Sequence, residues 1–199
     1  MNEQYWWMDH SPPRPQIFRF GVRERFAIEI GPFFDASNSV RRVDVWAADR
    51  WLTCDDNNVY VPHFAELLSR AVSSFLISSE QRGIDLPAPE LSVEENYRRL
   101  RAEANAGDNS GFFSFRFMDW GPTADNVSAC LFWCGENVQI AFSFWRPTHP
   151  EPDELGKVFV AELPWWELAS ILHDAAWKLM WDWSDRSKWN PAQPIPEQQ

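Results

Sequence analysis

The chain has 199 residues, 45% of them hydrophobic, which is enough to bury one good core, so we expect a single domain. Its 29 acidic and 18 basic residues give a formal net charge of −11. Such a surface repels phosphate backbones, which disfavours direct nucleic-acid binding and favours a basic protein partner; solubility alone explains the acidity equally well. With 13 Trp and 15 Phe, some aromatic side chains are expected at a binding surface.

Targeting and redox features favour a cytoplasmic protein. The segment 1–10 lacks the basic region and long apolar stretch of a signal peptide. No run approaches the roughly 18 apolar residues of a membrane span, so no membrane partner is expected. Three cysteines make no disulfide framework and agree with a reducing compartment. The oligomeric state is left open by the sequence.

Two terminal stretches are expected to lie outside the packed domain. Residues 1–15 end in Ser-Pro-Pro-Arg-Pro and are predicted to form an arm. Residues 184–199 are polar, contain three prolines and are predicted to form a tail. The single domain therefore spans residues 16–183.

The first strands are predicted from alternating hydrophobicity. Residues 17–30 are strand-like, most clearly in the part 26–30, where every second residue is large and apolar. Residues 40–47 and 51–54 are predicted to form a hairpin around residues 48–50.

Three helices are predicted from apolar periodicity and capping signals. Residues 62–79 carry apolar side chains at the i, i+3, i+4, i+7 spacing, and a second stripe of this kind begins after Pro164. Ser92 and Glu95 have the spacing of a capping box. The helix that they start, residues 93–106, has few apolar positions and is expected at the surface.

The middle of the chain is predicted to form a three-stranded meander. The strand-like runs are residues 111–120, 127–134 and 138–145, and short Gly- and Asn-containing connections favour antiparallel hairpins. The run 127–134 is apolar on both faces, as expected for a central strand. Residues 157–163 supply one more strand before the last helix.

Together these elements predict an α+β domain. We expect an antiparallel β-sheet of about six to seven strands, with the two amphipathic helices packed on one face and one surface helix. Parallel winding is disfavoured because the strands cluster along the chain.

No motif names a chemistry, and we predict no catalytic, cofactor-binding or metal-binding residue. His149 lies between two prolines and is expected to face solvent, while Cys54, at a strand end, has no histidine implied beside it. Cys130 and Cys134 would lie about 13 Å apart on one strand, too far for a disulfide. The acidic segment 55–58 is explained by turn chemistry, because it lacks the Gly and Glu of a calcium loop.

An acidic stretch with tryptophans is the predicted partner-binding surface. Residues 151–174 contain six acids and one base, with two adjacent tryptophans among them. Acidic charge steers a partner and Trp anchors it, whereas the alternative is that both indoles belong to the core. The predicted partner-binding residues are Asp55, Asp56, Glu151, Asp153, Glu154, Trp165, Trp166 and Glu167.

The order of elements resembles that of small immunity proteins of bacterial polymorphic-toxin systems over about residues 18–180. The resemblance is carried by the Phe-Ala-Ile-Glu-Ile strand 26–30, the hairpin 43–52, the strand-to-Pro-helix join and the acidic loop before the last helix. It implies a cytoplasmic, non-catalytic protein that binds and blocks a cognate, possibly basic, toxin domain, with no site residue carried over. The alternatives are an acidic phage-type inhibitor or nucleic-acid mimic, and an enzyme with a dispersed site.

Overall fold

The structure is a computed structural model that describes residues 16–34, 39–78 and 84–187. The predicted arm 1–15 lies outside the described residues, as does most of the predicted tail. Within the described part of the chain there are ten β-strands and four α-helices. The α+β class and the antiparallel pairing of the strands are confirmed.

The first sheet is built from the first five strands, in the order β1-β2-β3-β4 with β5 also paired to β3. The predicted hairpin after residue 40 is confirmed, because β3 turns into β4 through Ala48 and Asp49, both at positive φ. Strand β5 leads directly into a helix. The bounds are β1 Phe18–Val22, β2 Phe26–Phe33, β3 Val40–Ala47, β4 Arg50–Trp51 and β5 Asn58–Tyr60.

The second sheet has the order β10-β9-β8-β6, with β7 also paired to β8. Its central strand β8 has the predicted bounds, and β8 and β9 pair along their whole length from Val127↔Phe144 to Cys134↔Asn137. The bounds are β6 Ile84–Asp85, β7 Arg116–Phe117, β8 Val127–Cys134, β9 Asn137–Phe144 and β10 Phe159–Pro164.

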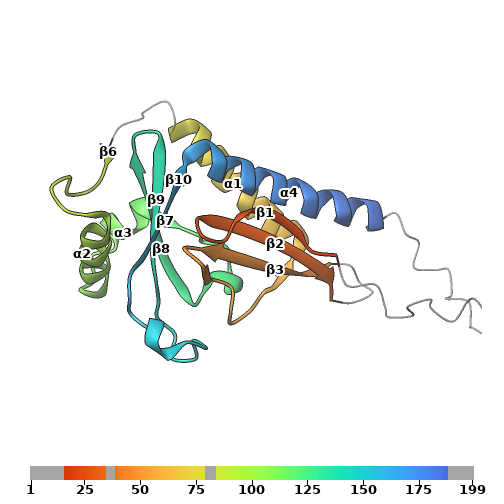
Figure 1. Ribbon diagram of the computed structural model, residues 1–199, viewed down its shortest axis with the longest axis horizontal. Helices are drawn as coiled ribbons and strands as arrows, with labels where there is room; N and C mark the ends of the chain where they lie inside the picture. The colour runs from red at the N-terminus through yellow and green to blue at the C-terminus, as the bar shows by residue number, and fades with distance from the viewer. Residues whose placement is uncertain (1–15, 35–38, 79–83, 188–199) are drawn as a thin grey trace, which may run out of the picture.

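The strands therefore form two sheets that share a core, and the expectation of one sheet is corrected. In Figure 1 the second sheet stands upright and the strands of the first sheet run across the page. The main core contains Ile28 and Val45 of the first sheet together with Ile140 and Phe142 of the second. Along the chain, α1 lies between the last strand of the first sheet and the first strand of the second.

The two long helices, α1 (Val61–Ser78) and α4 (Trp165–Ser187), pack on each other and cover one face of the first sheet, as predicted (Figure 1). Helix α4 continues into the range expected to be tail. Strand β1 lies close to α4 at Gly21, whose φ is +81° and where a Cβ would sit 2.6 Å from Ile171 Cδ1.

Helix α2 (Val93–Asn105) begins with the predicted capping box, since the Glu95 amide donates to Ser92 Oγ at 3.2 Å and the Ser92 amide donates to Glu95 Oε2 at 2.8 Å. It is packed more deeply than expected for a surface helix. Tyr97 and Leu100 are buried in a second, smaller core on the outer face of the second sheet. That sheet is thus covered on both sides, which explains why β8 is apolar on both faces.

The prediction of a strand over residues 111–120 is wrong for most of that range. Residues Ser110–Phe115 form the short helix α3, and only Arg116–Phe117 pair with β8 as β7. Asp108 Oδ1 accepts from the Ser110 amide at 3.1 Å, in a local turn directly before this helix. The turn places Phe112 in the second core and leaves Phe113 exposed, a division that the alternating pattern could not anticipate.

Candidate functional site

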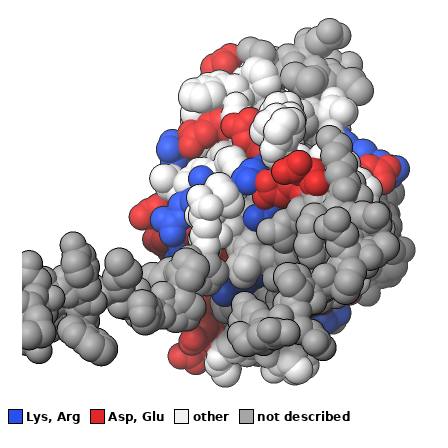
Figure 2. Space-filling view, turned by 90° about the vertical axis from the view of Figure 1, so that its right-hand side faces the viewer, with Lys and Arg blue, Asp and Glu red and all other residues white. Residues whose placement is uncertain are grey.

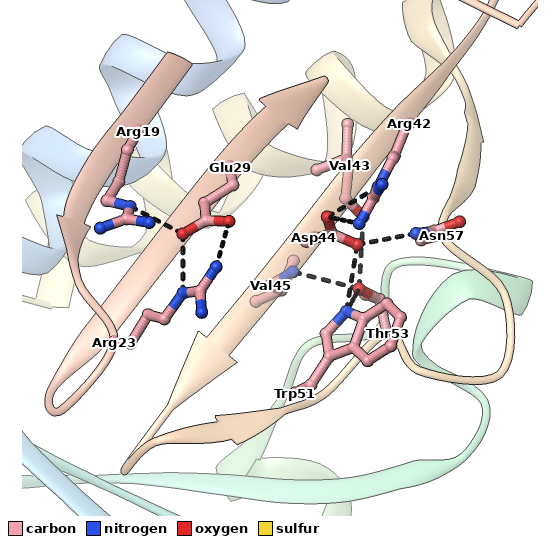
Figure 3. A network of polar contacts seen from close by, with 10 residues as sticks. All are labelled: Arg19, Arg23, Glu29, Arg42, Val43, Asp44, Val45, Trp51, Thr53 and Asn57. Atoms are coloured by element: carbon pink, nitrogen blue, oxygen red, sulfur yellow. Dashed lines mark hydrogen bonds and ion pairs between the residues drawn. The ribbon is translucent and has the colours of Figure 1, made fainter. Parts of the chain in front are cut away.

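The open face of the first sheet carries buried carboxylates held by arginines. Glu29 on β2 is 3% exposed, and Arg23 grips it with two bonds, Nε to Oε1 at 2.8 Å and Nη2 to Oε2 at 2.7 Å (Figure 3). Arg19 Nε lies 2.7 Å from the same Oε1. The hydrogen bonds from Arg23 lower the pKa of Glu29, so its carboxylate stays charged at neutral pH.

Asp44 on β3 is the second buried carboxylate of this face. Arg42 Nε donates to its Oδ2 at 2.8 Å, and Asn57 Nδ2 donates to its Oδ1 at 2.7 Å (Figure 3). Trp51 Nε1 donates to the same Oδ1 at 3.1 Å and lies 3.2 Å from Thr53 Oγ1. These bonds fix the residues that follow β4, because Asn57 and Thr53 belong to the loop after that strand.

Aromatic rings complete the open face. Trp46 and Trp51 stack with centroids 5.9 Å apart, and the Arg23 guanidinium lies 3.8 Å from the centroid of the Trp46 ring. Both indoles are half-buried. The result is a preorganised polar and aromatic surface that none of the described helices covers.

The open face leads into a cluster that joins two loops distant in sequence. Cys54 Sγ lies 3.4 Å from His149 Nδ1, and His149 Nε2 lies 3.2 Å from Glu154 Oε2. Asn126 Nδ2 donates to Cys54 Sγ at 3.3 Å. Arg50 Nε also holds Glu154 at 3.0 Å.

The expectation that His149 faces solvent is wrong, because its ring is buried. It stacks on Phe144 at a centroid distance of 3.9 Å, with an interplanar angle of 17°. Tertiary contacts with residues up to 95 positions away surround it, and no local pattern announces them. The histidine next to Cys54 was therefore missed by sequence reasoning.

The cysteine in this cluster is poorly placed to act as a nucleophile. Burial raises the pKa of the Cys54 thiol, and the charges of Asp55 and Glu154 raise it further. A thiol is reactive as its thiolate, which needs a lowered pKa. The arrangement is suited to clamping the two loops together.

Cys130 and Cys134 both lie on strand β8, as predicted. Cys54, Cys130 and Cys134 are all free thiols. Cys130 is buried among apolar side chains, and this burial raises its pKa to about 12. Among the described residues no group of three or more His, Cys, Asp or Glu is placed to hold a metal ion.

Five of the eight predicted partner-binding residues are brought together in adjoining loops. Thr148 Oγ1 lies 3.5 Å from Asp55 Oδ2, which joins the loop after β4 to the loop after β9. We call these residues the acidic loop cluster: Asp55, Asp56, Glu151, Asp153 and Glu154. Glu151 and Asp153 are exposed, whereas Glu154 is engaged by Arg50 and His149.

The other three predicted residues lie at the opposite end of the second sheet. The Trp165 amide donates to Glu136 O at 3.2 Å, which puts the start of α4 beside the β8–β9 turn. In Figure 1 the loop between β9 and β10 is at the lower end of these strands and the start of α4 is at the upper end. The predicted surface is therefore two separate regions.

At the upper region the adjacent tryptophans divide between core and solvent. Trp165 packs against Trp133, with centroids 6.2 Å apart, while Trp166 is 57% exposed. Glu167 is paired with Arg25 at 2.8 Å. Only one of the three is thus exposed as an anchor.

The sequence analysis missed a pair of exposed aromatic side chains on the outer side of α4. Trp177 and Trp181 stack with centroids 5.1 Å apart, and both are exposed. Their spacing of four residues, off the apolar stripe of the helix, is a signal that could have identified them.

The net negative charge does not make every face of the molecule uniformly acidic. On the face seen in Figure 2, acidic and basic side chains are interspersed. Among the described helices, none combines the length and the apolar character that a membrane crossing requires.

No protein-family model matches the chain, and no curated protein matches it. Among solved structures, the crystal structure of CdiI from Burkholderia dolosa AUO158 is similar, with a TM-score of 0.53 and 17% sequence identity. The alignment covers 81% of this chain and 99% of that chain. This chain therefore shares the fold of CdiI over nearly the whole length of that protein.

Proposed function

We propose that this chain is an immunity protein that binds and neutralises a cognate toxin domain in the cytoplasm. The observation that carries the proposal is the shared fold with CdiI, a contact-dependent inhibition immunity protein, across 99% of that chain. The resemblance stated from the sequence points the same way and rests on different observations, namely the order and composition of the elements.

The surface chemistry supports binding through protein contacts. Exposed Glu151 and Asp153 would steer a basic partner, since complementary charge accelerates encounter. The open face beside them offers Trp and Arg, residue types that dominate binding energies at interfaces. Its side chains are already fixed by hydrogen bonds, so little conformational entropy would be lost on binding.

We further propose that neutralisation requires no catalysis by this chain. The cluster most like a catalytic site contains Cys54 and His149, but the raised pKa of the thiol favours its neutral form. The same contacts explain how the acidic loop cluster is held in one arrangement.

The proposal is tested by co-expression with the product of the gene next to this one, as the candidate toxin domain. Growth rescue and a stable complex are expected, and loss of both with well-folded proteins would contradict the proposal. A charge-reversed variant, Glu151→Lys with Asp153→Lys, is expected to weaken the complex at least about tenfold if the cluster steers or contacts the partner.

The matched control is Glu90→Lys, an exposed acid in the loop before α2, away from the acidic loop cluster. It changes net charge in the same direction but lies outside the proposed surface. Glu90→Lys makes half the charge change of the double variant, so a loss of binding free energy about half as large would mean that total charge, rather than this cluster, is responsible.

A further inference from the structure

A hollow of about 350 Å³ lies at the edge of the second sheet, between α2, α3 and the end of β9. Its lining includes Arg101, Phe112, Met118, Ser128 and Trp145. This volume is at the lower end of the range, about 300–1,000 Å³, in which small ligands are bound. None of the residues that line the hollow belongs to the open face or to the acidic loop cluster.

Arg101 differs from the other arginines whose side chains the structure describes, because each of those has a carboxylate within ion-pair distance and Arg101 has none. Its guanidinium lies 5.3 Å from the centroid of the Phe112 ring. An arginine stacked on a ring keeps its N–H donors at the edge free for a planar acceptor. In a protein with a net charge of −11, an unpaired guanidinium beside a hollow is a conspicuous donor.

The other charged residues that line the hollow, Arg116, Asp119 and Asp125, are each held in an ion pair. Arg116 Nη2 lies 2.9 Å from Asp119, and Arg146 Nη2 lies 3.1 Å from Asp125. With Arg146 counted, although it lies outside the lining and also stands 4.0 Å from Asp55, the two pairs cancel and leave the charge of Arg101. One positive charge matches a monoanion, whereas a dianion such as hydrogen phosphate would leave one negative charge without a partner.

A buried hydroxyl in the lining also lacks a partner. Ser128 is 7% exposed, and its Oγ makes no hydrogen bond with any described residue. The neighbouring Tyr97 hydroxyl is already used, since it lies 2.7 Å from Ser143 Oγ and donates to Ser128 O at 2.8 Å. Buried polar atoms normally have a hydrogen-bond partner, so Ser128 Oγ is a second donor that is available to a ligand.

The rest of the lining is apolar. Phe112, Phe117 and Met118 are buried, and Trp145, 53% exposed, stands at the rim. An anion bound here would therefore carry an apolar group next to its charge.

We propose that this hollow binds the C-terminal carboxylate of a polypeptide whose last residue is apolar. Only at a chain end does one residue carry both a carboxylate and an apolar side chain. Arg101 and Ser128 would hold the carboxylate, and the aromatic and Met side chains would cover the apolar group. The inference does not depend on the proposed immunity function.

Methionine methyl NMR of the full chain tests the proposal, because Met118 lines the hollow while exposed Met180 on α4 is an internal reference. The probes are N-acetyl-L-phenylalanine, N-acetyl-L-phenylalaninamide and inorganic phosphate. The acid is expected to shift the Met118 signal saturably and leave Met180 unchanged, with the amide binding at least about tenfold more weakly.

Variants separate the two donors. Arg101→Gln is expected to reduce affinity for the acid to that for the amide, Arg101→Lys to leave an intermediate affinity, and Ser128→Ala to weaken binding about threefold or more. The control Arg99→Gln removes an exposed arginine of the same helix, paired with Glu103 and outside the hollow, and should change nothing.

Four results would overturn the proposal: no saturable Met118 shift, equal affinity for acid and amide, tighter binding of phosphate, or unchanged affinity in folded Arg101→Gln and Arg101→Lys. The chemical shifts of the other methyl groups report whether each variant is folded.

Discussion

Glu29 on β2 lies directly opposite Asp44 on β3, so two buried carboxylates are cross-strand neighbours on the open face of the first sheet. Like charges in this position are normally destabilising by a few tenths to about 1 kcal/mol. Here Arg19 and Arg23 neutralise the first carboxylate, and Arg42 neutralises the second. Ion pairs therefore stabilise this open face of the sheet. A face covered by a helix would be stabilised by apolar contacts instead.

Replacing Glu29 tests this arrangement. Glu29→Gln keeps the shape of the side chain but removes its charge, so it is expected to lower the free energy of unfolding by about 1–2 kcal/mol at pH 7. Urea denaturation followed by circular dichroism measures the change. The exposed Glu24→Gln, in the turn before β2, is the control and should change it by less than about 0.5 kcal/mol.

The same residue predicts a pH dependence. Because its pKa is lowered in the folded state, Glu29 contributes stability that is fully present above its unfolded pKa, about 4.3, and is lost as pH falls through the folded value. The difference in unfolding free energy between wild type and Glu29→Gln should thus shrink between about pH 6 and pH 3. A difference that stays constant over this range would contradict the account.

Tyr97 is predicted to stabilise the contact between α2 and the second sheet. Tyr97→Phe removes a buried hydroxyl that donates to Ser128 O and lies 2.7 Å from Ser143 Oγ, so unfolding free energy should fall by about 1–2 kcal/mol. Denaturant unfolding measures it, with Tyr60→Phe, at an exposed position, as the control. No change in Tyr97→Phe would mean that water replaces these bonds at no cost.

Cys54 is predicted to react slowly with alkylating reagents. Its pKa is raised by burial, so at pH 8 its alkylation by iodoacetamide should be slower than that of free N-acetylcysteine, and the rate should rise as pH increases. Mass spectrometry of the modified peptide gives the rate, and Cys54→Ser identifies the signal. A rate above that of the free thiol would instead support a nucleophilic role.

Gly21 is predicted to be intolerant of a side chain. Gly21→Ala would place a Cβ against Phe26 O and Ile171 Cδ1 at a positive φ, so a loss of about 2–4 kcal/mol is expected. Gly135→Ala has the same kind of φ, +68°, but no atom within 4 Å of the added Cβ. It should lose only about 1 kcal/mol, and equal losses would show that φ alone matters.

The two regions of the predicted partner-binding surface should act independently. Asp153 and Trp166 are separated by the length of β10, about 20 Å at ~3.3 Å per residue. In a complex with the toxin domain, the effects of Asp153→Lys and Trp166→Ala on binding free energy should add within about 0.5 kcal/mol. Calorimetry of both single variants and the double variant measures the coupling, and a larger coupling would mean that one partner segment contacts both regions.

Local sequence patterns correctly predicted those elements that depend mainly on residues close to them in the chain. The capping box at Ser92, the strand β8 and the hairpin at Ala48 depend on residues close to one another in the chain. The strand predicted over residues 111–120 failed because Phe112 and Phe115 also have the i, i+3 spacing of one helical turn, and in the structure both pack on the second core from helix α3.

The sequence by itself determined the α+β class, the net negative charge and most of the order of strands and helices, because these follow from composition and periodicity. Only the tertiary structure decided that the strands form two sheets, that His149 meets Cys54 and that Arg101 has no partner. Each of these depends on contacts between residues far apart in the chain. Periodicity fixes which face of an element is apolar, but it carries no information about which other element will cover that face.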